Sequence, residues 1–258
     1  MKGIRIAVSG KGGVGKTTFA GTIARMLARD GFDVLAVDAD PSMNLATALG
    51  IANPPAPLTD HSELIDERAG LQGGAFRLNP KVDDIVSRFG VTGPDGVKLL
   101  VMGTVAKGGS GCMCPASAFL RALLRHIILK ENSIVVMDME AGVEHLGRGT
   151  TRGIDIMLIV VEPGMRSVDT AGRIHRLAQD IGITKFGAVL NKSKEGAESV
   201  RQSLADLGIP LLGSIPYDDE LQAADIEGTA PIDKKSPAIV AIAKIKDAVR
   251  ESVGQCQN

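Results

Sequence analysis

The chain has 258 residues, a formal net charge of −1 and 44% hydrophobic residues, values that suit one large domain with a buried core. The near-neutral charge argues against binding to nucleic acid or to an anionic membrane, and 3% aromatic residues disfavours a surface for stacking single strands. No apolar run reaches the roughly 20 residues of a membrane span, and the first residues enter a strand with no signal-peptide pattern. We therefore expect a cytoplasmic protein with no nucleic-acid or membrane partner.

Runs rich in Val, Ile and Leu alternate with helical patterns along the chain. The expected strands are 4–8, 34–38, 98–102, 134–138, 156–161, 187–191 and 211–215, and the expected helices are 16–29, 116–129, 167–180, 197–207 and 237–253. This alternation predicts an α/β fold, a single domain over residues 1–258 with a doubly wound, mostly parallel sheet and helices on both faces. The ligand of such a sheet binds at the carboxyl ends of the strands.

Residues 51–96 break the alternation. Pro54, Pro55 and Pro57 cannot continue a helix, and no convincing core strand follows them. We expect this segment to be an excursion on the domain surface, as a switch or a partner-contact region.

The strongest motif is Gly-Lys-Gly-Gly-Val-Gly-Lys-Thr-Thr at positions 10–18, which follows a strand and opens a helix as a P-loop does. Its glycines allow backbone N–H groups to converge on phosphate oxygens, and the helix directs its positive end to the same place. The Lys16 ammonium would reach the β- and γ-phosphates, and the Thr17 hydroxyl would bind Mg²⁺. The predicted nucleotide-binding residues of this loop are Gly12, Gly13, Val14, Gly15, Lys16, Thr17 and Thr18.

Carboxylates end two of the expected strands. Asp38 ends the strand 34–38 and Asp40 follows two residues later. Asp138 ends the run Ile-Val-Val-Met-Asp, which is similar to a Walker B strand. Beside a P-loop such groups can orient water and Mg²⁺, so we expect Asp38 and Asp138 at the Mg²⁺ site together with Thr17. A capping role is the alternative for Asp40.

The first lysine of the loop makes the motif more specific. The pattern Lys-Gly-Gly-x-Gly-Lys-Thr resembles the deviant Walker A motif of the MinD, ParA and nitrogenase-iron-protein group. The resemblance implies that Lys11 reaches the nucleotide of the facing subunit in a homodimer, and that Lys11, Lys16 and Asp40 are the catalytic residues. In this family Asp40 would position the attacking water, and Asp38 would have a switch role nearby. An ordinary solvated lysine is the alternative for Lys11.

The sequence Asn191-Lys192-Ser193-Lys194 resembles the Asn-Lys-x-Asp element of GTPases, except that Lys194 replaces the carboxylate that reads guanine. We therefore expect ATP and ADP rather than guanine nucleotides. In the related ATPases this asparagine meets adenine and an Ile-Pro-x-Asp segment flanks the base, which implies roles for Asn191, Lys192 and Pro216.

Cys112 and Cys114 lie in a glycine-rich segment, and their two thiolates would fill half of a tetrahedral metal site. A two-fold axis would supply a second pair, so the site would form across the homodimer. Four sulfurs suit Zn²⁺, whereas Ni²⁺ often prefers square-planar surroundings. Two ordinary small buried residues are the alternative, and Cys256 is expected to be incidental.

The segments 108–115 and 138–150 look like those of the CooC-type nickel-maturation ATPases of carbon monoxide dehydrogenase and acetyl-CoA synthase. The resemblance implies an ATP-dependent, dimerising metallochaperone that holds Ni²⁺ (or Zn²⁺) with Cys112 and Cys114 and delivers nickel to the apo-form of such an enzyme. Gly142 would permit a γ-phosphate switch, and Glu144 and His145 would serve the metal or an interface.

Two other functions remain open at this point. A MinD- or ParA-like positioning ATPase would need a membrane-binding tail or a basic DNA-binding surface, and the helix at 237–253 is better explained by docking on its own domain. An iron–sulfur ATPase or reductase like the nitrogenase iron protein usually arranges its cluster cysteines differently. Neither alternative accounts for the adjacent pair of cysteines.

Overall fold

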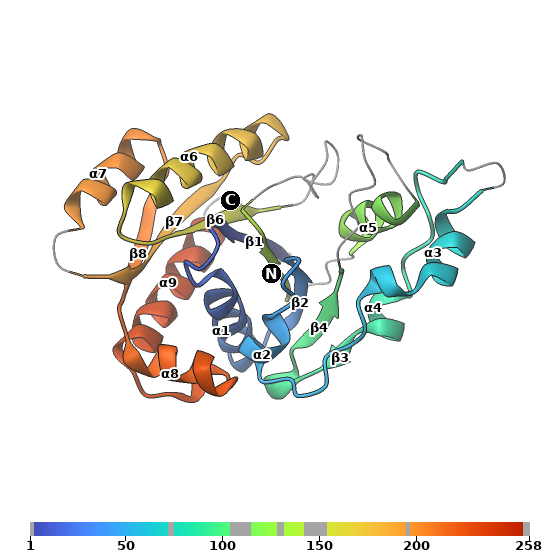
Figure 1. The fold of residues 1–258 in the computed structure, drawn as a ribbon, viewed down its shortest axis with the longest axis horizontal. Helices are drawn as coiled ribbons and strands as arrows, with labels where there is room; N and C mark the ends of the chain where they lie inside the picture. The colour runs from blue at the N-terminus through green and yellow to red at the C-terminus, as the bar shows by residue number, and fades with distance from the viewer. Residues whose placement is uncertain are drawn as a thin grey trace.

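The computed structural model describes residues 3–71, 75–103, 115–127, 132–141, 154–194 and 197–254, and its strands form one sheet (Figure 1). The strands in chain order are β1 (Ile4–Gly10), β2 (Asp33–Ala39), β3 (Val91–Thr92), β4 (Lys98–Val101), β5 (Ser133–Met139), β6 (Ile156–Val161), β7 (Phe186–Ser193) and β8 (Leu211–Pro216). Their spatial order is β3-β4-β2-β5-β1-β6-β7-β8, and the pairs are parallel except that β3 runs antiparallel to β4. The predicted mostly parallel α/β sheet is thus confirmed.

Helices cover both faces of the sheet, as predicted. They are α1 (Lys16–Arg29), α2 (Leu45–Leu49), α3 (Ser62–Ala69), α4 (Ile85–Phe89), α5 (Pro115–His126), α6 (Met165–Asp180), α7 (Glu198–Asp206), α8 (Asp219–Glu227) and α9 (Pro237–Gly254). Alternate strand residues point to opposite faces. One buried apolar cluster joins the sheet to α3, α5, α6 and α7, and a second joins it to α1, α2 and α9.

The segment 51–96 is more than a surface excursion, which corrects the expectation from its prolines. It leaves the regular alternation of strand and helix and lies beyond β4 (Figure 1). Leu58, Ile65 and Ile85 are nevertheless buried in the cluster under α5. The sequence pattern failed here because α3 and α4 are short, so few turns carry the apolar period that would identify them.

Helix α9 docks on its own domain, which confirms the sequence interpretation of its apolar face. Ile242, Ile245 and Val249 are buried against β8 and α1. The Lys246 ammonium, itself largely buried, pairs with Asp30 at the end of α1. No helix in the described ranges is long and apolar enough to span a bilayer.

The strand order places the functional residues at one edge of the sheet. From β1 the chain crosses to β2 on one side, whereas β6 lies on the other side of β1. Gly10 is therefore in register with Val160, and Asp38 with Asp138, at the carboxyl ends of their strands. A reversal of strand order creates a crevice at this end, where a ligand binds in doubly wound sheets.

Candidate nucleotide-binding site

The loop between β1 and α1 has a backbone that only glycine adopts without strain. Gly13 and Gly15 have φ values of 79° and 92°. A Cβ on Gly15 would lie 2.4 Å from Nδ2 of Asn191, and one on Gly10 would lie 2.3 Å from the carbonyl oxygen of Val160. These glycines allow the loop to turn tightly against β6 and β7 and to open directly into α1 at Lys16.

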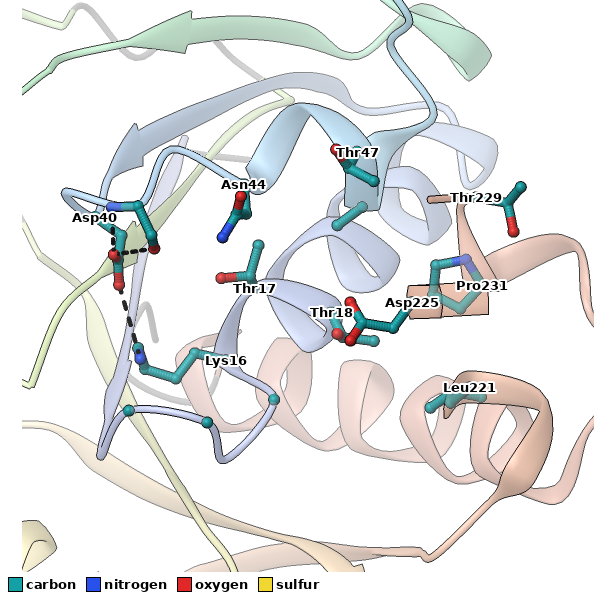
Figure 2. Close-up of a pocket in the computed structure, with 15 residues that line it drawn as sticks. Lys16, Thr17, Thr18, Asp40, Asn44, Thr47, Leu221, Asp225, Thr229 and Pro231 are labelled. Carbon is teal, nitrogen blue, oxygen red and sulfur yellow. Dashed lines mark hydrogen bonds and ion pairs between the residues drawn. The ribbon is translucent and has the colours of Figure 1, made fainter. Parts of the chain in front are cut away.

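A pocket of about 480 Å³ lies over this loop and the first turn of α1 (Figure 2). Of the predicted site residues, Gly12, Gly13, Gly15, Lys16, Thr17, Thr18 and Asp40 line it. The remaining lining residues come from the turn after β2, from α2, and from α8 with the segment after it: Ser42, Asn44, Thr47, Ala48, Leu221, Asp225, Thr229 and Pro231. The pocket thus extends from the phosphate-binding loop across α1 to α8.

Lys16 and Asp40 face each other at one end of this pocket (Figure 2). The Lys16 ammonium is buried, 3.7 Å from Oδ2 of Asp40, and donates to the carbonyl oxygen of Lys11 at 3.4 Å. Burial acts to raise the pKa of Asp40, but hydrogen bonds from the hydroxyl and amide of Ser42, together with Lys16, lower it overall. Asp40 is therefore ionised at neutral pH and can accept a hydrogen bond from water.

Asp138 is fully buried at the end of β5, beside the start of α1. Its Oδ2 accepts a hydrogen bond of 2.6 Å from the Thr17 hydroxyl, whereas its Oδ1 is buried without a hydrogen-bond partner. Burial raises the pKa of Asp138 to about 7, and the Thr17 hydrogen bond opposes this only in part. An unpartnered buried carboxylate oxygen beside a threonine hydroxyl is an oxygen donor set that fits Mg²⁺.

Asp38 lies in register with Asp138 and is also fully buried. Its two oxygens accept hydrogen bonds from the amides of Asp40 (3.2 Å) and Leu45 (2.9 Å), so it shapes the turn that carries Asp40 into α2. Burial raises the pKa of Asp38 to about 6 despite these bonds. In this structure Asp38 thus organises the segment 40–45, and its place at the Mg²⁺ site stays a prediction.

Three further predicted residues lie outside the lining of the pocket, and two of them support the loop. Asn191 is buried, and its Nδ2 donates to the carbonyl oxygen of Val14 at 2.7 Å. The Lys192 ammonium donates to the carbonyl oxygen of Gly13 at 2.7 Å. Pro216 ends β8 and is followed by Tyr217, whose amide donates to the carbonyl oxygen of Ser193. The expected contacts of Asn191, Lys192 and Pro216 with the nucleotide remain predictions.

The cysteines predicted to hold the cargo metal, and the other residues considered with them, lie outside the described part of the chain. These are Cys112 and Cys114, together with Gly142, Glu144, His145 and Cys256. Within the described residues no group of three or more His, Cys, Asp or Glu side chains is placed to hold a metal ion.

Sequence reasoning missed the wall of the pocket that α2 and α8 supply. Helix α8 could have been found, because Asp218 accepts a hydrogen bond from the amide of Glu220 as an N-cap and Gly228 ends the helix with a φ of 65°. Asp225 and Thr229 come to the pocket only through tertiary packing, so no local signal marks them. Glu162, immediately after β6, was also missed, and it pairs with both Lys11 and Lys192.

Comparison with known proteins is consistent with this geometry. Residues 6–232 match the family described as the CobQ/CobB/MinD/ParA nucleotide binding domain. The chain is 43% identical to the carbon monoxide dehydrogenase accessory protein CooC of Rhodospirillum rubrum, covering 98% of this chain and 99% of that protein. It is 44% identical to an uncharacterised ATP-binding protein of Methanocaldococcus jannaschii, covering 94% and 96%.

Solved structures share the fold. The septum site-determining protein MinD of Pyrococcus horikoshii, complexed with Mg-ADP, aligns with a TM-score of 0.70 at 19% identity over 98% of each chain. A plasmid partition protein of Borrelia burgdorferi bound to AMPPNP gives a TM-score of 0.72 at 16% identity, over 97% of this chain and 100% of that one. The chain therefore belongs to the CobQ/CobB/MinD/ParA nucleotide-binding family and is a P-loop ATPase.

Proposed function

We propose that the protein is a cytoplasmic, ATP-dependent metallochaperone that dimerises and helps to insert nickel into carbon monoxide dehydrogenase or acetyl-CoA synthase. The observation that carries the proposal is the 43% identity to CooC, which extends over nearly the full length of both chains. The Cys-Met-Cys segment at 112–114 supports it, because paired thiolates suit a metal cargo and a positioning ATPase has no need of them.

The described residues suit the ATPase part of this cycle. The P-loop amides and the buried Lys16 ammonium would hold the phosphates, and Asp40, kept ionised by Ser42 and Lys16, would orient the attacking water. Thr17 and Asp138 would hold Mg²⁺, which supplies positive charge to the phosphate oxygens. Asp38 would couple this site to the segment 40–45 through its hydrogen bonds to the backbone.

The dimer links hydrolysis to the metal in this proposal. Lys11 of each subunit would complete the site of the other, and closure would bring the two Cys112–Cys114 pairs together around one Ni²⁺ or Zn²⁺. A ligand shifts such an equilibrium only through its different affinities for the two states, so nucleotide and metal should strengthen each other's binding. Loss of the γ-phosphate would then loosen the metal site and release nickel to the client.

A positioning ATPase is the main competitor, and one observation counts against a MinD-like tail. Of the apolar residues of α9, Ile242, Ile245 and Val249 are buried in this domain, whereas Val240 is exposed. Co-sedimentation with anionic vesicles or with DNA that depends on ATP would favour the competing function.

Nickel delivery to a client tests the proposal. We expect that nickel-free carbon monoxide dehydrogenase, with limiting Ni²⁺ and a competing chelator, gains activity with the wild-type protein and Mg²⁺·ATP. ADP in place of ATP, or the Cys112→Ser/Cys114→Ser protein, should leave activation at the level seen without the chaperone. Equal activation by wild-type and cysteine-free protein would exclude the proposed route for nickel.

A further inference from the structure

Glu162 lies immediately after β6 and bridges two lysines that the sequence assigns to the nucleotide site. Its Oε1 is 3.7 Å from the Lys11 ammonium, and its Oε2 is 3.8 Å from the Lys192 ammonium. One lysine belongs to the P-loop and the other to the end of β7. The Glu162 carboxylate therefore links the P-loop, which follows β1, to β7, which lies two strands away from β1 in the sheet.

The topology holds Glu162 in this position. Strand β6 lies between β1 and β7, with Val160 in register with Gly10 and Val161 with Leu190. Glu162, the first residue after β6, thus comes between Lys11, which follows Gly10, and Lys192, which lies two residues after Leu190. The Glu162 amide donates to the hydroxyl of Ser167 at 3.1 Å, and Ser167 is buried at the start of α6.

The two lysines are held to different degrees. Lys192 has a second anchor, because its ammonium donates to the carbonyl oxygen of Gly13 at 2.7 Å. Lys11 has a side chain that is 41% exposed, and in the described part of the chain Glu162 is its ion-pair partner. Lys11 is also absent from the lining of the nucleotide pocket. In this structure the Lys11 ammonium thus lies beside Glu162, and its side chain does not line its own pocket.

We propose that Glu162 is a positioning residue that holds Lys11 within its own subunit until the nucleotide of a second subunit competes for it. The inference rests on the proposed function, since it assumes that Lys11 acts across the dimer. When Lys11 moves to the other subunit, the Glu162 carboxylate keeps its ion pair with Lys192, so it is not left without a cation. The bridging arrangement therefore opposes dimer closure only weakly and in a reversible way.

The size of the effect follows from the exposure of the pair. A partly exposed ion pair shifts an equilibrium constant by about two- to fivefold. A symmetric dimer breaks two such pairs, one in each subunit, so their effects multiply. We expect removal of the Glu162 charge to tighten nucleotide-dependent dimerisation about tenfold.

The test compares Glu162→Gln with Glu198→Gln. Glu198 also forms an ion pair, 3.6 Å from Arg201 on α7, so its change alters the net charge equally at another place. The first measurement is the acetylation rate of Lys11 in nucleotide-free protein, followed by mass spectrometry. The second is the dimer dissociation constant with saturating Mg²⁺ and a non-hydrolysable ATP analogue, so that a change in nucleotide affinity does not contribute.

We expect Glu162→Gln to raise the Lys11 acetylation rate several-fold and to tighten the dimer about tenfold, with Glu198→Gln close to wild type in both. An unchanged acetylation rate would show that Glu162 does not hold Lys11 and would overturn the inference. Faster acetylation with unchanged or weaker dimerisation would overturn the gating role. If wild type and variant both stay monomeric with the analogue, the proposed dimer is wrong and the gating role is wrong with it. The acetylation rates then report only whether Glu162 pairs with Lys11 in the single chain.

Discussion

A Lys16→Ala protein is expected to lose ATP hydrolysis by about 10²- to 10³-fold, at every protein concentration. The Lys16 ammonium is buried and lines the pocket, 3.7 Å from Asp40. Its removal takes away the charge that would meet the β- and γ-phosphates, and it leaves Asp40 without its cation. Nucleotide affinity of the single chain should fall as well, which titration of a fluorescent ATP analogue would measure.

Lys11→Ala is the matched comparison, because Lys11 belongs to the same loop but lies outside the lining of the pocket. We expect this protein to bind nucleotide as a single chain nearly as well as wild type, yet to lose hydrolysis that depends on dimerisation. A mixture of Lys11→Ala and Asp40→Asn chains should regain activity. In the mixed dimer, the site of the first chain keeps Asp40 and receives Lys11 from the second.

Two outcomes would contradict these separate roles, in which Lys16 acts in its own site and Lys11 in the site of the other subunit. Full activity of Lys11→Ala protein at all concentrations would remove the role of Lys11 across the dimer. If the mixed chains form dimers but show no more activity than either variant alone, the catalytic residues do not combine across the interface.

Asp138→Asn is expected to abolish Mg²⁺-dependent hydrolysis and, at the same time, to stabilise the nucleotide-free protein at alkaline pH. Burial raises the pKa of Asp138 from 3.8 to about 7, so the folded chain keeps a proton that the unfolded chain releases between about pH 4 and 7. The free energy of unfolding of the wild type therefore falls as pH rises through this window, and the Asn variant lacks this penalty. Asp38, with its pKa raised to about 6, acts in the same direction in both proteins.

The measurement is urea denaturation of both proteins at pH 5 and pH 8, without Mg²⁺ or nucleotide. The stability of Asp138→Asn relative to wild type should increase by on the order of 2–3 kcal/mol between these pH values. The asparagine oxygen can still accept the Thr17 hydroxyl, so the local packing is preserved. Asp206→Asn, at the exposed end of α7, is the control and should show no such increase. A pH-independent difference would mean that Asp138 is already ionised in the empty site.

Much of this fold could be predicted from the sequence, because the strands of a parallel sheet covered on both faces are nearly continuous apolar runs. β6 was placed at its observed bounds, and α1 at Lys16–Arg29, since the P-loop glycines mark where the helix begins. The residues 51–96 were harder. Their helices are short, and their burial under α5 depends on packing rather than on a local period.

The residues of the site also fall into those that the sequence indicated and those that it did not. Lys16, Thr17 and Asp40 lie in a contiguous motif or at the end of a predicted strand, so the sequence alone indicated their neighbourhood. Glu162 pairs with Lys11 of the loop and Asp225 lines the same pocket, although both lie more than 140 residues away from the loop along the chain. The place of Glu162 requires the spatial order of the strands, in which β6 lies beside β1, and that of Asp225 requires the packing of α8 over the pocket; chain order gives neither.

The most direct test of the central claim is a titration of reduced, metal-free protein with Ni²⁺, with molar mass followed by light scattering. It is done with and without Mg²⁺ and a non-hydrolysable ATP analogue, on wild type and on Cys112→Ser/Cys114→Ser protein. The proposed function predicts one Ni²⁺ per two chains, a doubled mass, tighter nickel binding with nucleotide, and loss of nickel binding without the cysteines. Failure to bind nickel in any nucleotide state, or equal binding by the cysteine-free protein, would contradict it.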